Sequence, residues 1–309
     1  MLDTPKVAIL LCTFYGQHHL AEQLESFAEQ SHSNWEVFAS DDGSQDGTHS
    51  ILEIYRAQWG IGRISVHHGP SEGFVANFLS LSCNANIQAD YYAYSDQDDI
   101  WESDKLERAI AWLEQVDKDK PALYCTRTRL VDAANQEIGL SPLFVRPPSF
   151  SNALAQNIGG GNSMVFNEAA RHLLKYAGAD VNVVSHDWWL YLVVTGSGGI
   201  VCYDPYPSLR YRQHDANLIG MNTGWRARWQ RVLLLLNGRF KEWNDIHIAA
   251  MERIRQKLTT RNQHVLSEFS ESRQAWLLPR LVRMKRCGIH RQTFLGNVGL
   301  FFAILANKL

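Results

Sequence analysis

The fold of this chain is decided by one stretch of sequence, WEVFASDDGSQDGT at residues 35–48. Its first part, residues 35–40, has the apolar and aromatic pattern of a strand. Its second part is rich in Asp, Gly and Ser, which favour turns, and a capping residue precedes a helical pattern at residues 48–57. The stretch therefore predicts a strand, an acidic turn and a helix in direct succession.

The residues before this stretch predict another strand and another helix. VAILLCTF at residues 7–14 is a continuous apolar run, as expected for a strand buried on both faces of a parallel sheet. In residues 20–30 the apolar side chains fall on one helical face. These are Leu20, Leu24, Phe27 and Ala28. Strand, helix and strand in this order predict a right-handed βαβ unit and an α/β fold.

A second acidic segment, YSDQDDIW at residues 94–101, follows the aromatic run YYAY. Asp96, Asp98 and Asp99 repel one another, and each raises the pKa of the others unless a cation lies between them. Mg²⁺ or Mn²⁺, with oxygen ligands from carboxylates and substrate phosphates, is the natural compensating ion. The alternative is a solvated acidic turn that caps the next helix, since short acidic matches are common.

Both acidic segments lie at predicted strand ends. In open α/β sheets, ligands bind beyond the carboxyl ends of the strands. Asp41 and Asp42 follow one strand, and Asp96, Asp98 and Asp99 follow another. Two acidic strand ends in one sheet indicate a metal–diphosphate site.

Taken together, the opening run, the DDGSQDGT turn and the DQDDIW segment resemble the inverting GT-A glycosyltransferases of family 2. The order and spacing match over roughly the first 220 residues, and rhamnosyltransferase-like enzymes of bacterial surface polysaccharide assembly are the most similar kind. The resemblance implies a GT-A, Rossmann-like catalytic domain with a mostly parallel central sheet. It also implies inverting transfer of a sugar from a nucleoside diphosphate.

The resemblance assigns the donor site as follows. Thr13 and Phe14 would lie beside the nucleotide base, and Asp42, together with Asp41, would accept hydrogen bonds from the base or ribose. The alternative is that one of this pair caps the following helix. Asp96 would reach the ribose.

The same resemblance places a metal ion on the donor diphosphate. Asp98 or Asp99 would coordinate Mg²⁺ or Mn²⁺, which would act as a Lewis acid on the departing nucleoside diphosphate. In the segment YRQHDAN at residues 211–217, His214 would complete the metal shell or contact the diphosphate. Arg212 would pair with the donor phosphates.

The acceptor side of the site is assigned to two further segments. In SHDWW at residues 185–189, Asp187 would be the general base; the alternative is a helix N-cap. Trp188 and Trp189 would either stack on a sugar or belong to the core. The glycines of GGGNS at residues 159–163 would floor the acceptor pocket, with Gly160, Gly161 and Asn162 near the site, or form a strand bulge.

Composition agrees with a globular enzyme. The chain has 309 residues, 45% hydrophobic and 20% charged, which allows a large core. Five scattered cysteines fit no zinc spacing, so reduced thiols and a cytoplasmic location are expected. The first apolar run is too short for an export signal. We expect a catalytic domain at 1–224 and a basic, amphipathic helical region at 225–309.

Charge is divided unevenly between these two regions. Residues 225–309 hold 16 of the 30 Lys and Arg but only 5 of the 32 Asp and Glu. Basic residues alternate there with Trp, Leu and Phe, the pattern of a helix in a membrane interface. The final apolar segment, residues 294–306, is well short of the ~20 residues that span a bilayer. We therefore expect peripheral binding to the inner face of the cell membrane; alternatively, these helices pack on the catalytic domain or on a second subunit of a homodimer. No groove-reading motif indicates nucleic acid.

The predicted function is thus metal-dependent, inverting sugar transfer to a growing cell-surface glycan on a polyprenyl diphosphate lipid. The first expected donor is dTDP-rhamnose and the second a UDP-hexose. Two alternatives stay open: a nucleotidyltransferase and a non-catalytic scaffold that binds glycan or nucleotide. The loop after the first strand, TFYGQHH at residues 13–19, has one glycine and no Lys or Arg, which disfavours the nucleotidyltransferase.

Overall fold

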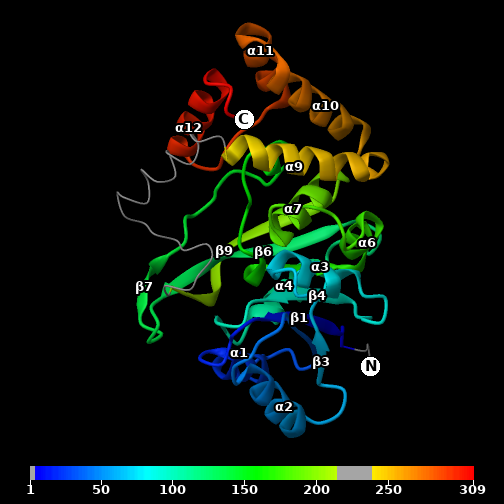
Figure 1. Ribbon diagram of the computed structural model, residues 1–309, viewed down its shortest axis with the longest axis vertical. Helices are drawn as coiled ribbons and strands as arrows, with labels where there is room; N and C mark the ends of the chain where they lie inside the picture. Colours follow the sequence, from blue (N-terminus) through cyan, green and yellow to red (C-terminus); the bar gives the residue numbers. More distant parts are fainter. Residues whose placement is uncertain (1–3, 214–238) are drawn as a thin grey trace.

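The computed structural model describes residues 4–213 and 239–309. One mixed sheet runs through the catalytic part, with strands in the order β3-β2-β1-β4-β8-β6-β9-β5, and β7 pairs with the outer part of β6 (Figure 1). The strands are β1 (Val7–Thr13), β2 (Trp35–Asp41), β3 (Ile64–His68), β4 (Tyr91–Ser95), β5 (Ile100–Trp101), β6 (Ala122–Val131), β7 (Glu137–Leu140), β8 (Val165–Asn167) and β9 (Ile200–Arg212).

The first half of the sheet is parallel, as predicted. β1 lies between β2 and β4 and is parallel to both, and β2 is parallel to β3. The three-residue strand β8 then runs antiparallel to both β4 and β6, while β6 and β9 are parallel to each other. The α/β fold with a mostly parallel central sheet is confirmed, and β8 is the point where the direction changes.

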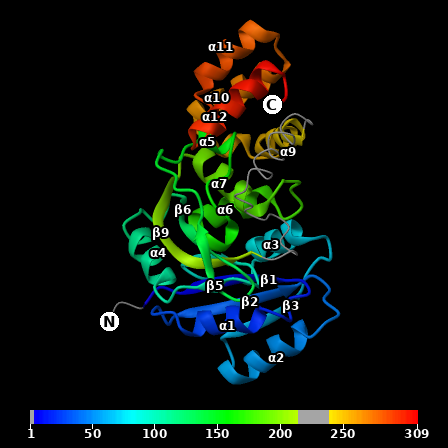
Figure 2. The same ribbon diagram turned by 90° about the vertical axis from the view of Figure 1, so that its left-hand side faces the viewer.

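Helices cover both faces of the sheet (Figure 2). Those of the sheet region are α1 (Leu20–Ala28), α2 (Thr48–Trp59), α3 (Phe74–Cys83), α4 (Lys105–Leu113), α5 (Phe150–Ala153), α6 (Glu168–Ala177) and α7 (His186–Gly196). Alternate residues of β1 serve the two faces. Val7, Ile9 and Leu11 pack in one core with the side chains of α1, α2 and α4. Ala8 and Leu10 pack in the other core with those of α3, α6 and α7.

The C-terminal region is helical, with α9 (Arg239–Arg253), α10 (Thr260–Gln274), α11 (Leu277–Cys287) and α12 (Phe294–Leu305) stacked at one end of the molecule (Figure 1). Its apolar side chains, including Met251 and Phe269, continue the core that α7 shares with the sheet. The predicted boundary at 224/225 lies outside the described residues. α9 therefore packs on the catalytic part, which is the alternative considered for this region.

Two further expectations concern cysteines and membrane spans. The five cysteines are all free thiols. Among the described helices, none has the length and apolar character needed to cross a bilayer.

Candidate active site

The ends of β1 and β2 meet through Thr13 and Asp41, which are level in the parallel register. The Thr13 hydroxyl donates to Asp41 Oδ1 over 2.8 Å, and the Ser44 backbone N–H and hydroxyl donate over 2.8 and 2.6 Å. Burial would raise the pKa of Asp41, but the hydrogen bonds from Ser44 and Thr13 lower it below its usual value. The Asp41 side chain has no exposed surface. Asp41 therefore fixes the turn, which corrects the expectation that it contacts a nucleotide.

Asp42 holds a different segment in place. Its two carboxylate oxygens accept the backbone N–H groups of Ser71 and Gly73 over 2.7 and 2.8 Å. These bonds tie the loop before α3 to the end of β2, and Asp42 is 8% exposed. A carboxylate oxygen can accept a second hydrogen bond. The nucleotide contact expected of Asp42 stays a prediction.

An exposed aromatic pair follows β1. Phe14 and Tyr15 are about half exposed, and their ring centroids lie 4.6 Å apart, edge to face. Gln97, from the acidic segment, donates from Nε2 to the Phe14 carbonyl over 2.9 Å and accepts the Phe14 N–H over 2.8 Å. This reciprocal pair fixes the loop after β1 to the loop after β4, so the aromatic surface stands beside the carboxylates.

The three carboxylates after β4 differ in their surroundings. Burial, followed by the charges of Asp98 and Asp187, raises the pKa of Asp96 to about 7, against a smaller opposing effect of Lys105. Asp99 is fully buried. It accepts Asn162 Nδ2 over 2.5 Å and the Arg212 backbone N–H over 3.2 Å. Burial and the charges of Asp98 and Asp96 raise the pKa of Asp99 well above its usual value. Asp98 is partly exposed.

Lys105, the first residue of α4, is a buried cation beside this cluster. Its ammonium donates to the Asn162 carbonyl and lies 4.1 Å from the centroid of the Trp101 ring. Burial lowers its pKa to about 7, although Asp99 and Asp96 act in the opposite direction. The raised pKa values of Asp96 and Asp99 show that the carboxylates lack enough positive charge around them, and a bound cation would supply it.

The glycine segment and the start of α7 complete the site. Gly161, in the short 3₁₀ helix Gly161–Ser163, donates its N–H to Asp187 Oδ2 over 3.1 Å. The charge of Asp187 is felt by Asp96, so the two carboxylates face one region. The N-cap of α7 is Ser185, and Asp187 is the second residue of the helix. Of the glycine segment, Gly161 and Asn162 thus touch the predicted carboxylates directly, and Gly160 precedes them.

The buried ring of His186 packs against the Gly161–Ser163 segment. Its ring stacks on Phe78, with centroids 3.8 Å apart, and lies edge to face with Tyr94 at 4.7 Å. Burial lowers its pKa to about 4, so the ring is neutral near pH 7. A methyl group on Gly161 would come within 2.4 Å of His186 Nε2. Glycine is therefore required there because α7 approaches the backbone so closely.

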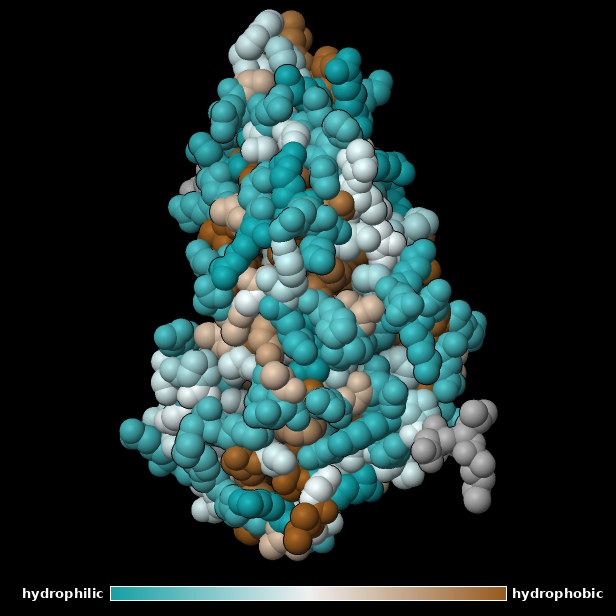
Figure 3. Space-filling view, turned by 90° about the vertical axis from the view of Figure 1, so that its right-hand side faces the viewer, coloured by the Kyte–Doolittle hydropathy of each residue, from teal (hydrophilic) through white to brown (hydrophobic). Residues whose placement is uncertain are grey.

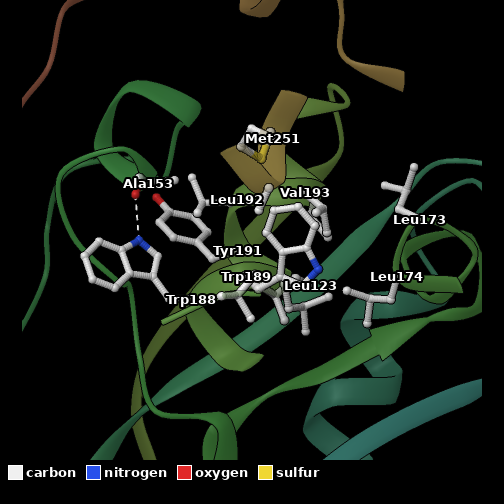
Figure 4. Packing of buried hydrophobic residues seen from close by; sticks show 14 of the residues in the cluster. Leu123, Ala153, Leu173, Leu174, Trp188, Trp189, Tyr191, Leu192, Val193 and Met251 are labelled. Carbon is white, nitrogen blue, oxygen red and sulfur yellow. Dashed lines mark hydrogen bonds between the residues drawn. The ribbon is translucent and has the colours of Figure 1, made fainter. Parts of the chain in front are cut away.

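Trp188 and Trp189 do not face a ligand. Both are buried in the core above the sheet, at 6% and 0% exposure, and the Trp188 indole N–H donates to the Ala153 carbonyl over 2.7 Å (Figure 4). Leu123, Leu174 and Met251 surround Trp189 in the same cluster. Of the two alternatives for this pair, core packing is correct and sugar stacking is wrong.

Arg212 is also structural. Its side chain is 1% exposed. Its guanidinium donates to the Asp98 carbonyl over 3.0 Å, to the Ala133 carbonyl over 2.7 Å and to the Glu22 carboxylate of α1. These donors hold β9 against the acidic turn, and the phosphate contact expected of Arg212 stays a prediction. His214 lies outside the described residues.

No group of three or more His, Cys, Asp or Glu within residues 4–213 and 239–309 is arranged to hold a metal ion. The expected ligand His214 lies outside these residues. The carboxylate oxygens present nevertheless suit a hard cation. Asp98 lies close enough to Asp96 for its charge to raise the pKa of Asp96.

Sequence reasoning missed two residues of this site. Gln97 could have been found from its position between Asp96 and Asp98, where an amide can bridge two loops. Lys105 could have been found as the first cation after the acidic segment, at the start of the next helix.

Comparison with known proteins agrees with this geometry. Residues 8–174 match the model of the family described as glycosyl transferase family 2. A dTDP-rhamnosyl transferase, RfbG of Shigella flexneri, is 28% identical over 240 residues, which are 74% of this chain and 79% of that protein. The putative glycosyltransferase EpsE of Bacillus subtilis is 34% identical over 115 residues, 37% of this chain and 41% of its own length.

Solved structures of similar fold cover nearly the whole chain. TarS of S. aureus, residues 1–349, aligns with a TM-score of 0.52 and 13% identity over 91% of this chain and 89% of that one. The mannosyltransferase PcManGT of Pyrobaculum calidifontis, solved with GDP-Man and Mn²⁺, aligns with a TM-score of 0.50 and 15% identity, over 99% and 86% of the two chains. At these identities the likeness shows a shared GT-A fold.

Proposed function

Since this chain belongs to glycosyl transferase family 2, we propose that it transfers a sugar, with inversion, from a nucleoside diphosphate to a hydroxyl of a cell-surface polysaccharide. One observation carries the proposal. Asp96, Asp98 and Asp187 come from two segments some 90 residues apart in sequence, yet Asp98 and Asp187 both raise the pKa of Asp96. A single displacement needs a donor-holding cluster and a base that reaches the acceptor hydroxyl, and the proximity of Asp187 to the cluster fits that need.

The donor proposed first is dTDP-rhamnose and the second a UDP-hexose. The relative RfbG, named as a dTDP-rhamnosyl transferase, supports the first. Phe14 supplies an exposed ring for the base, beside the end of β1 where Thr13 lies. Asp42 and Asp96 supply carboxylate acceptors for base and ribose.

We propose Asp98, with His214, as the ligands of Mg²⁺ or Mn²⁺. Asp98 is favoured over Asp99 because Asp99 is fully buried and accepts two protein hydrogen bonds, while Asp98 is partly exposed. When bound, the ion would neutralise charge on the diphosphate as it leaves. Asp99 would instead keep Asn162 and the backbone of Arg212 in position around the cluster.

Asp187 is the proposed general base. Gly161 N–H and Trp188 N–H donate to its two oxygens over 3.1 and 2.7 Å, which fixes the orientation of the carboxylate at the start of α7. The acceptor oxygen attacks the anomeric carbon and the bond to the diphosphate oxygen breaks. Asp187 takes the proton of the attacking hydroxyl.

The proposed acceptor is a growing glycan on a polyprenyl diphosphate lipid at the inner face of the cell membrane. The putative teichuronic acid biosynthesis glycosyltransferase TuaG of Bacillus subtilis, 29% identical over 109 residues, supports a polysaccharide acceptor. The alternative of a nucleotidyltransferase is disfavoured by the family assignment.

The test combines binding and product analysis. The purified chain is heated with dTDP, UDP or GDP in the presence of Mn²⁺, and the nucleotide that raises Tm most identifies the donor base. Matching nucleotide sugars are then incubated with an undecaprenyl diphosphate glycan, and products are analysed by mass spectrometry. Stabilisation by dTDP and addition of one deoxyhexose are expected. Release of a nucleotide sugar from a sugar phosphate and dTTP would instead establish a nucleotidyltransferase.

A further inference from the structure

The outer surface of α11 and α12 carries large apolar side chains that no part of the described chain covers. On α12 six of them are exposed: Phe294, Leu295, Val298, Phe301, Phe302 and Leu305. They recur at spacings of three and four residues, so they share one helical face, opposite the buried Leu300, Ala303 and Ile304. Figure 3 shows apolar side chains at the tip of the molecule where Figure 1 places α11.

On α11 the exposed face is divided between apolar and basic residues. Leu278 and Val282 are 61% and 51% exposed, and Lys285 and Arg286 follow them on the same side. Arg280 points the other way, into the structure, where it donates to the Ile304 carbonyl over 3.0 Å and joins α11 to α12. The exposed apolar residues of α12 and the exposed basic residues of α11 thus lie at the same end of the molecule (Figure 1).

Residues 272–309 contain seven Lys or Arg and no Asp or Glu. Two of the seven are paired within the molecule: Arg273 contacts Asp245 over 2.7 Å, and Arg283 contacts Glu268 and Glu271 of α10. Lys285 and Arg286 are exposed at the end of α11, so positive charge stands beside exposed apolar residues there.

We propose that the outer face of α11 and α12 docks the protein on an anionic lipid bilayer. α12 has 12 residues and is about 18 Å long, which is too short to cross a hydrocarbon core of about 30 Å but suits a helix lying in the interface. Lys285 and Arg286 then lie at the level of anionic headgroups. A second copy of the chain fits less well, because the same face has no carboxylate to meet these cations.

The inference goes beyond the proposed reaction, and its test needs no substrate. The purified full-length chain is floated with vesicles of phosphatidylcholine and phosphatidylglycerol at 3:1, and with vesicles of phosphatidylcholine alone. We expect binding to the mixed vesicles that weakens with salt. Leu295→Gln with Phe302→Gln should lower the partition coefficient about tenfold or more. Lys285→Gln with Arg286→Gln should lower it about fivefold per residue and remove most of the salt dependence.

Matched controls replace exposed apolar and basic residues outside α11 and α12 with glutamine. Ile54→Gln with Ile61→Gln replaces two exposed apolar residues on and after α2, and Lys118→Gln with Lys120→Gln replaces two exposed lysines before β6. Both control pairs should bind vesicles like the unchanged chain. Equal binding by all variants, or no binding by the unchanged chain, overturns the proposal. So does a lipid-independent dimer in light scattering that the Leu295/Phe302 variant converts to a monomer.

Discussion

At the scale of single residues, the carboxylates of the site differ in burial and in hydrogen bonding. Asp41 and Asp99 point into the protein and fix turns, whereas Asp98 and Asp187 keep some exposure beside the cluster. The division follows from hydrogen bonding, since a buried carboxylate needs donors around it and both buried ones have them.

Replacing the proposed base should remove activity without unfolding the protein. We expect Asp187→Asn to lower kcat by about 10²–10⁴-fold, because the amide cannot take the acceptor's proton. Tm should stay within the range of the unchanged chain. The measurement is transfer to a glycan acceptor, with Asp119→Asn, an exposed carboxylate before β6, as the control. Near-full turnover by Asp187→Asn would end its assignment as base.

The raised pKa of Asp96 predicts a pH-dependent stability in the absence of metal. The folded form holds its proton to about pH 7, whereas an unfolded aspartate releases it near pH 4. Stability from this group is therefore present at low pH and lost as pH rises through about 7. Asp96→Asn should remove that loss and raise Tm at pH 8 by about 2 °C or more. Thermal melts from pH 5 to 8 in EDTA measure this; parallel curves for both proteins would contradict it.

Residue types at the site were predictable, but their directions were not. The acidic segments and Asp187 stood out because carboxylates after apolar strands are costly without a partner. The alternation of side chains between the two faces of a sheet ends with the strand. The sequence DQDD therefore does not show which carboxylate points into the protein. The roles of Trp188 and Arg212 could not be read from the sequence for a related reason. An aromatic ring or a guanidinium that contacts a ligand has the same sequence signature as one that packs behind the site.

At the scale of elements, the site depends on how closely α7 approaches the 3₁₀ segment. Gly161→Ala would place a methyl 2.4 Å from His186 Nε2. We expect this substitution to destabilise the protein by about 1–3 kcal/mol and to lower kcat, since Asp187 loses its partner N–H. Urea unfolding and transfer assays give the two quantities.

A second substitution distinguishes steric overlap between residues 161 and 186 from other causes of the destabilisation. His186→Ala alone should cost about 2–4 kcal/mol through the cavity it leaves between Phe78 and Tyr94. In the double variant the alanine methyl at 161 has room, so the two costs should fall short of additivity by about 1 kcal/mol or more. Strict additivity would show that the contact between Gly161 and His186 does not carry the effect.

The elements themselves were largely readable from sequence. The strands at 7–14 and 35–40 and the helices at 20–30 and 48–57 were found within a few residues, because the apolar periodicity is strong. The order of the strands beyond β4 could not be read from the sequence. β8 has three residues and pairs with a strand more than 70 positions earlier, and so short a strand carries no pattern of its own.

At the scale of the whole molecule, buried arginines attach the terminal helices to one another. Arg280 donates to the Ala275 carbonyl over 2.7 Å and to the Ile304 carbonyl over 3.0 Å. Arg280→Met should leave these carbonyls unpaired and cost about 1–3 kcal/mol locally. Amide hydrogen exchange in α12 should then speed up about fivefold or more, while β1 and β4 stay protected.

The exposed Arg286→Met serves as the control for that substitution, since it lies on the same helix and removes the same charge. Its exchange rates in α12 should match those of the unchanged chain. Unaltered exchange in Arg280→Met would mean that apolar packing alone holds α12 in place.

The lack of any Asp or Glu in residues 272–309 has a further consequence. Guanidinium and ammonium groups keep their charge from about pH 5 to about pH 9. Acidification of the surroundings therefore cannot reverse the electrical sign of this end of the molecule. Its attachment to an anionic surface should persist from about pH 5 to about pH 9, whereas an attachment through protonated histidine would be lost as the pH rises.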